Sequence, residues 1–275
     1  MKGRAYARPF IIAMSSPPAA TRVRLTMLKV ENLTKVYDNG TVALKDVSFE
    51  VPDGQFLAVI GLSGSGKSTL LRCINRLIEP SEGRILWNGE DVTHAGQEDL
   101  RRFRRRVGMV FQHFNLVHRS KVITNVLAGR LGYTSPSMSL VNRFSKQDTA
   151  KAMAQLVRVG LEAKARSRAD ELSGGQQQRV GIARALMQDP EMILADEPVA
   201  SLDPVLAHSI MSYLDAINAD GVTVMCSLHF LDLVHRYSDR AIALNEGELV
   251  FDGLPSEIDD DRFKAIYGQE AERVG

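Results

Sequence analysis

The chain has 275 residues, of which 44% are hydrophobic and 24% charged, so it is long enough to bury one large core or two smaller ones. Its 34 Lys and Arg residues nearly balance its 33 Asp and Glu residues, which excludes a strong overall field for nucleic acid or an anionic membrane. The two cysteines, Cys73 and Cys226, lack metal-ligand spacing, which disfavours a zinc site or a disulfide scaffold and favours a reducing compartment. No stretch approaches about 18 consecutive apolar residues, so we expect any membrane contact to go through a partner.

The N-terminal segment, residues 1–26, carries five Lys or Arg and no acid. Its apolar patch, residues 10–14, is too short for the core of a signal peptide. We expect either a disordered tail or a start codon assigned too far upstream. The folded domain is then predicted over residues 27–275.

The first part of this domain predicts two hairpins. Residues 27–37 alternate apolar and polar side chains, residues 38–40 are a turn signal, and residues 42–51 form the returning strand. A second Asn-Gly turn stands at residues 88–89. Between the hairpins, the continuous apolar run 56–60 is typical of a strand buried on both faces.

Beyond this point buried strands alternate with helices. An apolar stripe predicts a helix over residues 69–78, and short apolar runs predict strands over residues 192–195 and 222–226. Residues 113–170 show helical periodicity without buried strands, with an exposed connection near residues 131–142. We therefore predict an α/β fold with a mainly parallel sheet, an antiparallel β subdomain and an α-helical subdomain over roughly residues 113–182.

A phosphate-loop motif follows the predicted strand 56–60 and opens the next helix, which is the context that GxxxxGK[ST] requires. Its glycines let backbone N–H groups converge on phosphate oxygens, and the helix N-terminus adds a partial positive charge. Lys67 is expected to reach the β- and γ-phosphates, and the Ser68 hydroxyl to ligate Mg²⁺. The flanking elements argue against a merely structural Gly/Ser-rich turn. The matching residues are Gly61, Leu62, Ser63, Gly64, Ser65, Gly66, Lys67, Ser68 and Thr69.

Two carboxylates, Asp196 and Glu197, follow the predicted strand 192–195 directly. Open parallel sheets bind their ligands at this end of the strands. Asp196 suits Mg²⁺, and Glu197 is placed to orient and polarise an attacking water. Taken alone, the dipeptide is equally compatible with two solvated acids at the end of a strand.

A second loop, Leu172-Ser173-Gly174-Gly175-Gln176, precedes an amphipathic helix. By itself it is compatible with a loop and a helix N-cap. Beside a phosphate loop, its backbone N–H groups predict a second reader of the γ-phosphate.

With these motifs the sequence resembles the ATP-binding-cassette (ABC) family over residues 28–253, and this implies a phosphate-loop NTPase fold of the ABC-ATPase type. The resemblance implies that Tyr37 stacks on adenine and that His229 contacts the γ-phosphate. It also implies that Gln112 senses Mg²⁺ and the attacking water and couples to a membrane partner. Catalysis is then assigned to Glu197, His229 and Gln112.

The resemblance also implies a dimer. Residues 172–176 of one chain complete the phosphate site of the other, so that two chains enclose two ATP molecules. Residues 201–203 match the loop that contacts the partner across this dimer.

Within the family, residues 111–117, 125–127 and 193–204 are similar to the ATP-binding subunits of phosphonate importers. This implies ATP hydrolysis coupled to phosphonate uptake, with a homodimer on the cytoplasmic face of a bacterial inner membrane, two permease subunits and a periplasmic binding protein. Residues 121–124 and Ser227 depart from the subgroup pattern, so import of phosphate, phosphite or another small solute stays open. A non-transport ABC ATPase is a further alternative, although the coiled-coil, zinc or second-cassette insertions typical of that class are not found.

Five arginines lie among residues 101–106. They could form a nucleic-acid patch, but Glu98 and Asp99 beside them favour a solvated helix face near the membrane partner. We therefore expect no nucleic-acid partner.

Overall fold

The computed structural model describes residues 26–133 and 144–268. The predicted tail lies outside the described residues except for Thr26, which opens the first strand, and most of the predicted connection at 131–142 lies outside them too. Within the two described stretches, no helix combines the length and the apolar character needed to cross a bilayer.

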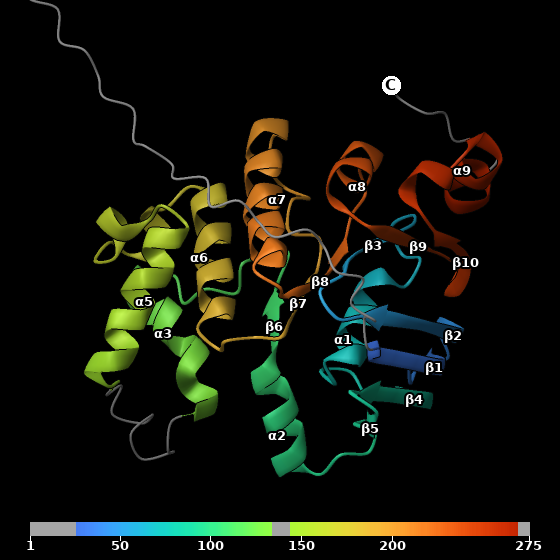
Figure 1. Cartoon of the computed structure of the whole chain (residues 1–275), viewed down its shortest axis with the longest axis horizontal. Helices are drawn as coiled ribbons and strands as arrows, with labels where there is room; N and C mark the ends of the chain where they lie inside the picture. The colour runs from blue at the N-terminus through green and yellow to red at the C-terminus, as the bar shows by residue number, and fades with distance from the viewer. Residues whose placement is uncertain (1–25, 134–143, 269–275) are drawn as a thin grey trace, which may run out of the picture.

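Two β-sheets form the framework of the molecule (Figure 1). One is antiparallel with the order β2-β1-β4-β5, and the other is mixed with the order β10-β9-β3-β8-β7-β6. In the mixed sheet β9, β3, β8, β7 and β6 are parallel, and β10 pairs antiparallel with β9 at the edge. The strands are β1 (Thr26–Val36), β2 (Val42–Pro52), β3 (Phe56–Ile60), β4 (Glu82–Trp87), β5 (Glu90–Asp91), β6 (Val107–Val110), β7 (Met192–Ala195), β8 (Thr223–Ser227), β9 (Arg240–Asn245) and β10 (Glu248–Gly253).

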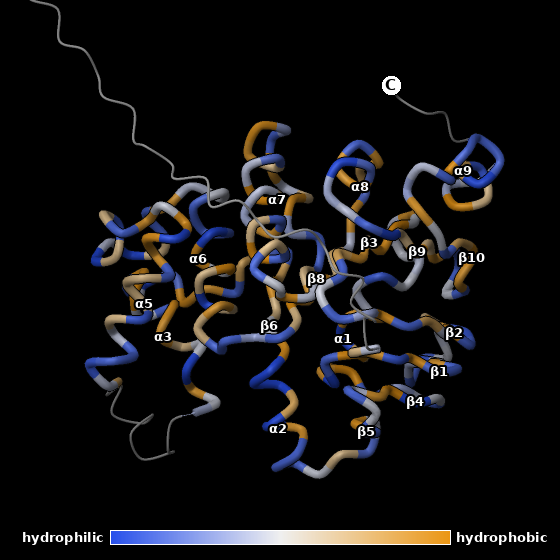
Figure 2. The backbone as a smooth tube through the Cα atoms, in the orientation of Figure 1, coloured by the Kyte–Doolittle hydropathy of each residue, from blue (hydrophilic) through white to orange (hydrophobic). Residues whose placement is uncertain are grey.

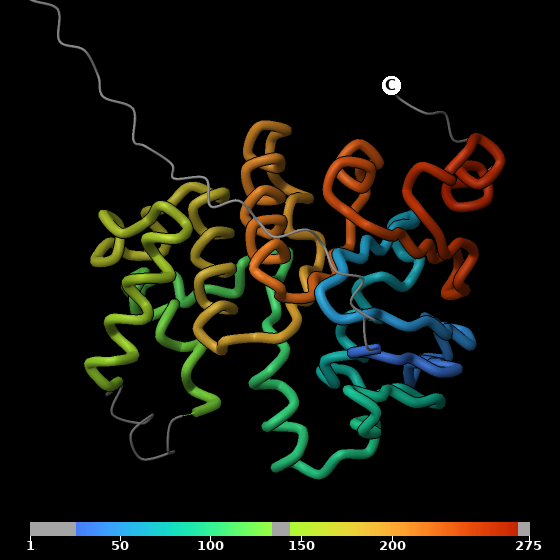
Figure 3. Tube along the Cα trace, in the orientation of Figure 1, coloured from blue at the N-terminus to red at the C-terminus, as the bar shows by residue number. Residues whose placement is uncertain are grey.

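Helices flank the mixed sheet. Figures 1 and 3 show α3, α5 and α6 at one end of the molecule and the antiparallel sheet at the other, with β6, β7 and β8 between them. The α-helices are α1 (Lys67–Ile74), α2 (Gln97–Arg106), α3 (Val122–Leu127), α5 (Lys146–Arg158), α6 (Gly174–Leu186), α7 (Pro204–Ala219), α8 (Leu231–Tyr237) and α9 (Asp260–Tyr267). The 3₁₀ turns are η1 (Ala128–Tyr133), η2 (Glu162–Lys164), η3 (Ala169–Glu171) and η4 (Pro255–Glu257).

The parallel strands of the mixed sheet are buried on both faces, and β3 shows how its side chains divide between two cores. Phe56, Ala58 and Ile60 belong to the core formed with the helices, whereas Leu57 and Val59 belong to the core under the antiparallel sheet. This division follows from the two-residue period of a strand. Figure 2 shows hydrophobic residues along the strands of the mixed sheet, whose buried side chains make up these two cores. Because β3 is packed on both faces, its position is fixed, and its carboxyl end can hold a site rigidly.

The predicted fold class is confirmed: the structure has a mainly parallel sheet, an antiparallel sheet and a helical region. Both predicted hairpins form, as β1–β2 and β4–β5. In the second, Asn88 and Gly89 have φ values of 50° and 83°, as a two-residue turn between antiparallel strands requires. The domain limits 27–275 and the helical limits 113–182 stay predictions.

The prediction for the helix after the phosphate loop was wrong at its C-terminal end. A helix was expected over residues 69–78, but α1 ends at Ile74. Arg76 adopts a left-handed φ of 54°, its N–H donates to the Cys73 carbonyl, and the Leu77 N–H donates to the Arg72 carbonyl. This Schellman arrangement ends the helix without a glycine, so no stop signal is visible in the sequence at this position.

The arginine cluster on α2 is less solvated than expected. Arg104 donates to the backbone carbonyls of Asn75 and Arg76, so it fastens α2 to the end of α1. Arg106 makes two hydrogen bonds of 2.6 and 2.7 Å to Glu191, which raise the pKa of its guanidinium. Part of the cluster therefore contributes to packing.

Candidate nucleotide site

The phosphate loop joins β3 to α1 in a conformation that only glycine allows at two positions. Gly61 and Gly66 have φ values of 140° and 105°. A Cβ atom on Gly61 would lie 2.1 Å from the Leu244 carbonyl oxygen, and one on Gly66 would lie 2.4 Å from the Ala43 carbonyl oxygen. The loop is thus pressed against two other segments, and its shape is fixed before any ligand binds.

The Lys67 side chain lies inside this loop and binds its backbone. Its side chain is 3% exposed, and its Nζ donates to the carbonyl oxygens of Gly61 at 2.8 Å and Leu62 at 2.9 Å. Burial lowers the pKa of the ammonium group, while the carboxylates of Glu197 and Asp196 oppose this shift. The lysine therefore holds a positive charge in the loop without a tight carboxylate partner, since Glu197 Oε1 lies 3.8 Å away.

Asp196 is the most enclosed carboxylate of the site, with no exposed surface. It accepts hydrogen bonds from Ser68 Oγ at 2.6 Å, from Arg72 Nη2 at 3.1 Å and from Ser227 Oγ at 3.4 Å. The sequence analysis assigned Ser68 and Asp196 to the same Mg²⁺ ion, and the structure places the two side chains in contact, but the analysis missed Arg72. The available signal was the spacing, because Arg72 stands one helical turn after Ser68 and so shares its face of α1.

Glu197 leaves the strand end in a left-handed conformation, with a φ of 47°. Its N–H donates to Ser227 Oγ at 2.8 Å, and its Oε1 lies 2.7 Å from His229 Nε2. The structure thus brings together Lys67, Glu197 and His229, which lie far apart in the sequence. Ser227 is the second residue of this cluster that had no assigned role.

The other predicted residues lie around this cluster. Tyr37 is within hydrogen-bond distance of Thr69, with 3.2 Å between the two hydroxyl oxygens. Gln112 follows β6 at the same sheet edge as Asp196, whose N–H donates to the Val110 carbonyl at 2.9 Å. In the described part of the chain, Gln112 makes no hydrogen bond to the cluster.

The loop Leu172–Gln176 is not part of this cluster. Ser173 caps α6: its Oγ accepts the Gln176 N–H, and Gln176 Oε1 accepts the Ser173 N–H. Gly174 and Gly175 form the first turn of the helix. The prediction that these residues read a phosphate of a second chain remains a prediction.

The residues present fit a nucleoside triphosphate. Ser65 Oγ is buried in the loop and has no hydrogen-bond partner among the described residues, and an open cavity of about 120 Å³ lies along the same loop. This cavity is lined by Ala43, Gly64, Gly66, Lys67, Ser68, Thr69 and Glu197. Phosphate oxygens would supply acceptors to the backbone N–H groups of the loop and to the Lys67 ammonium. The hydroxyl and carboxylate oxygens of Ser68 and Asp196 are the donor type that Mg²⁺ prefers.

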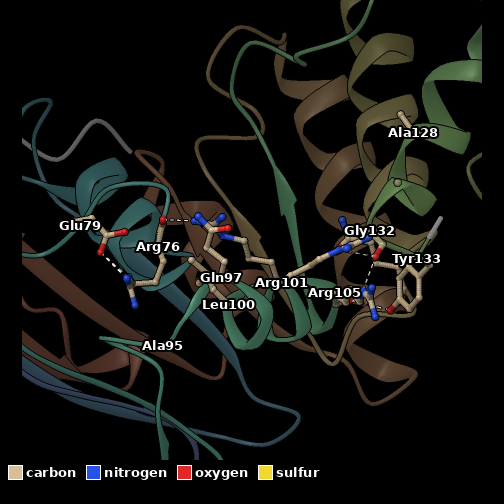
Figure 4. Close-up of a pocket in the computed structure, with 13 residues that line it drawn as sticks. Arg76, Glu79, Ala95, Gln97, Leu100, Arg101, Arg105, Ala128, Gly132 and Tyr133 are labelled. Atoms are coloured by element: carbon tan, nitrogen blue, oxygen red, sulfur yellow. Dashed lines mark hydrogen bonds and ion pairs between the residues drawn. The ribbon is translucent and has the colours of Figure 1, made fainter. Parts of the chain in front are cut away.

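A second concavity lies away from these residues, between α2, η1 and the end of α1 (Figure 4). Its volume is about 740 Å³, and its walls include Arg76, Arg101, Arg105 and Tyr133. Arg101 and Arg105 both donate to the Gly132 carbonyl, which links α2 to η1. None of the predicted nucleotide residues lines this groove.

The fold and the phosphate-loop site together define a phosphate-loop ATPase. Residues 44–200 match the ABC transporter family, and the chain belongs to this family. As an ABC ATPase, it has an ATP-binding domain.

Relatives match almost the whole chain. The phosphonates import ATP-binding protein PhnC of Bdellovibrio bacteriovorus is 52% identical over 250 residues, which cover 90% of this chain and 96% of that protein. The protein of the same name from Bacillus cereus is 51% identical over 248 residues, with the same coverage of 90% and 96%.

Solved structures agree. A nucleotide-free ATP-binding cassette from an ABC transporter superposes with a TM-score of 0.75 at 31% identity, covering 88% of this chain and 94% of that chain. A dimeric post-hydrolysis structure of an ATP-binding cassette bound to ADP and Pi gives a TM-score of 0.74 at 34% identity, covering 83% and 99%.

Proposed function

We propose that this chain is the ATP-hydrolysing subunit of an importer that takes up phosphonate across a bacterial inner membrane. The observation that carries the ATPase activity is the cluster of Lys67, Asp196, Glu197 and His229 at the end of the phosphate loop. The likeness to phosphonates import proteins over about nine-tenths of the chain supports phosphonate as the cargo.

Each polar residue of the cluster has a role in this proposal. Lys67 exchanges its two carbonyl partners for the β- and γ-phosphates. Ser68, Asp196 and Gln112 would hold Mg²⁺. Mg²⁺ held there would supply positive charge that neutralises the phosphates. Glu197 orients and polarises the attacking water, and His229 keeps the Glu197 carboxylate in place from 2.7 Å while it contacts the γ-phosphate.

The remaining site residues act at the edges of the nucleotide. The loop Gly61–Thr69 surrounds the phosphates, with backbone N–H groups of Ser63 to Gly66 as donors. Tyr37 stacks on the adenine. Residues Ser173–Gln176 of a second chain close over the γ-phosphate, because the capped N-terminus of α6 carries N–H donors. Dimerisation therefore completes the site.

The assembly in this proposal contains two copies of this chain at the cytoplasmic face of the membrane, two permease subunits and a periplasmic binding protein. The arginine-lined groove between α2 and η1 is a candidate contact surface for a permease. A segment bound in this groove would contact the C-terminal end of α1, the helix that begins in the phosphate loop. It would also contact η1 in the helical region. Acidic side chains on that segment would suit Arg101 and Arg105.

The test of this function compares hydrolysis and uptake. In a deletion strain, the wild-type gene restores uptake of radiolabelled methylphosphonate, and Glu197→Gln does not restore it, although the variant protein accumulates normally. Loss of the general-base carboxylate is expected to lower the hydrolysis rate of the purified chain by about 10²- to 10⁴-fold. Restored uptake of phosphate or phosphite but not methylphosphonate would refute the cargo, and normal hydrolysis by Glu197→Gln would refute the catalytic assignment.

A further inference from the structure

We propose that Ser227 is a positioning residue for ATP hydrolysis, whose single hydroxyl group holds the backbone of Glu197 and the carboxylate of Asp196 together. The inference rests on the roles proposed above for these two acids. It adds Ser227, a residue of β8 that is distant from both acids in the sequence and is brought into contact with them by the fold.

The hydroxyl of Ser227 uses its donor and its acceptor capacity at once. The residue ends β8 and has no exposed surface. Its Oγ accepts the Glu197 N–H at 2.8 Å and donates to Asp196 Oδ1 at 3.4 Å. Because one hydroxyl carries one hydrogen, these two contacts form a continuous chain from the Glu197 amide to the Asp196 carboxylate.

The Glu197 backbone needs such a contact. Asp196 still follows the sheet ladder, since its N–H donates to the Val110 carbonyl. One residue later, the φ of Glu197 is 47°, a value that residues other than glycine adopt rarely and hold only when their surroundings fix it. The hydrogen bond to Ser227 is made by the amide of this left-handed residue, so it fixes the direction in which the Glu197 side chain leaves the strand.

The end of β8 holds Glu197 at two points. Ser227 and His229 are two residues apart and lie on the same side of the chain, while Leu228 between them is buried in the apolar core. Ser227 binds the backbone of Glu197, and His229 lies 2.7 Å from its carboxylate. Ser227 thus sets the backbone from which His229 orients the carboxylate.

The same strand offers a matched control. Thr223, at the opposite end of β8, is also fully buried. Its Oγ1 accepts the Gly54 N–H at 2.8 Å and donates to Asp53 Oδ1 at 3.5 Å. This repeats the geometry of Ser227 far along the strand from the site, so a purely structural role predicts the same behaviour for both hydroxyls.

The first measurement needs no nucleotide. Amide hydrogen exchange is followed by NMR on the full chain. Ser227→Ala is expected to speed exchange of the Glu197 amide by about 10-fold or more and to leave the Gly54 amide unchanged, whereas Thr223→Val does the reverse. An unchanged Glu197 amide in Ser227→Ala would overturn the proposal.

The second measurement is steady-state ATP hydrolysis. Ser227→Ala is expected to lower kcat by about 10- to 100-fold while KM and the Kd for ATP change less than about twofold, because a displaced carboxylate affects the reaction and not nucleotide binding. Thr223→Val keeps kcat within about twofold of the wild type at a comparable loss of thermal stability. Equal kcat values in Ser227→Ala and the wild type would reduce Ser227 to a structural role and refute the inference.

Two conservative variants of Ser227 distinguish the effect of losing the hydroxyl from the effect of changing the side-chain volume. Ser227→Thr keeps the hydroxyl and is expected to retain both amide protection and turnover; if its extra methyl group prevents folding, Ser227→Cys keeps a weaker S–H group and gives values between the wild type and alanine. Loss of turnover in a folded Ser227→Thr with a protected amide would contradict the proposal. A wild-type chain without ATPase activity would instead refute the proposed function, and the exchange experiment would still decide the Ser227 contact.

Discussion

Lys67→Met is the substitution whose effect on nucleotide binding follows most directly from the site geometry. In the free chain, the ammonium donates to two neutral carbonyl groups, those of Gly61 and Leu62, at 2.8 and 2.9 Å. Phosphate binding replaces these acceptors by charged oxygens. A hydrogen bond between two charged groups is worth about 1 to 1.5 kcal/mol more than one to a neutral acceptor, so two of them contribute about 2 to 3 kcal/mol.

Lys67→Met is therefore expected to raise the Kd for ATP by about 30- to 150-fold. The stability of the free protein changes little, because the loss of two hydrogen bonds is offset by removal of a buried charge. Isothermal titration calorimetry measures the affinity, and Lys45→Met, which removes an exposed lysine paired with Glu248, is the control with unchanged Kd. An affinity of Lys67→Met within about twofold of the wild type would refute the assigned phosphate contact.

Two further predictions concern the fold around the site. Gly66→Ala places a Cβ 2.4 Å from the Ala43 carbonyl oxygen at a φ of 105°, and is expected to lower the free energy of unfolding in urea by about 2 to 4 kcal/mol. Gly40→Ala, at a φ of 82° with open space around the Cβ, should lower it by only about 1 kcal/mol. Equal losses of stability in the two variants would contradict the packing argument. Burial raises the pKa of the Cys73 thiol to about 12 and that of the Cys226 thiol further, so neither should react with a thiol reagent at pH 8 in the native chain, while both should react in urea. Rapid labelling of the native protein would show that these segments open.

The parts of the fold that the sequence predicted best are those in which local chemistry leaves little choice. The strand limits at 56–60 and 192–195 agree with β3 and β7, because continuous apolar runs need burial on both faces. The phosphate loop is equally local, since its glycines, lysine and hydroxyls stand in one segment. Asn88 and Gly89 marked the β4–β5 turn for the same reason.

The parts that were missed depend on contacts between distant segments. The end of α1 at Ile74 is produced by the left-handed Arg76, a residue with no helix-stop propensity, whose backbone is fastened by Arg104 from α2. Likewise Arg72 and Ser227 acquire a role only where α1 and β8 meet the end of β7 around Asp196. The spacing places Arg72 on the same helix face as Ser68, but only the fold shows that Asp196 is the partner of Arg72 and Ser227.

Multi-angle light scattering of Glu197→Gln, with and without ATP and Mg²⁺, shows whether ATP joins two copies of this chain. The substitution replaces a carboxylate by an amide of nearly the same shape, so nucleotide binding is retained while hydrolysis, which would release the partner, is blocked. We expect a monomer without nucleotide and a stable dimer at saturating ATP, because in our proposal residues 173–176 of each chain complete the site of the other. A monomer at saturating ATP, with binding of the nucleotide verified in the same sample, would contradict it.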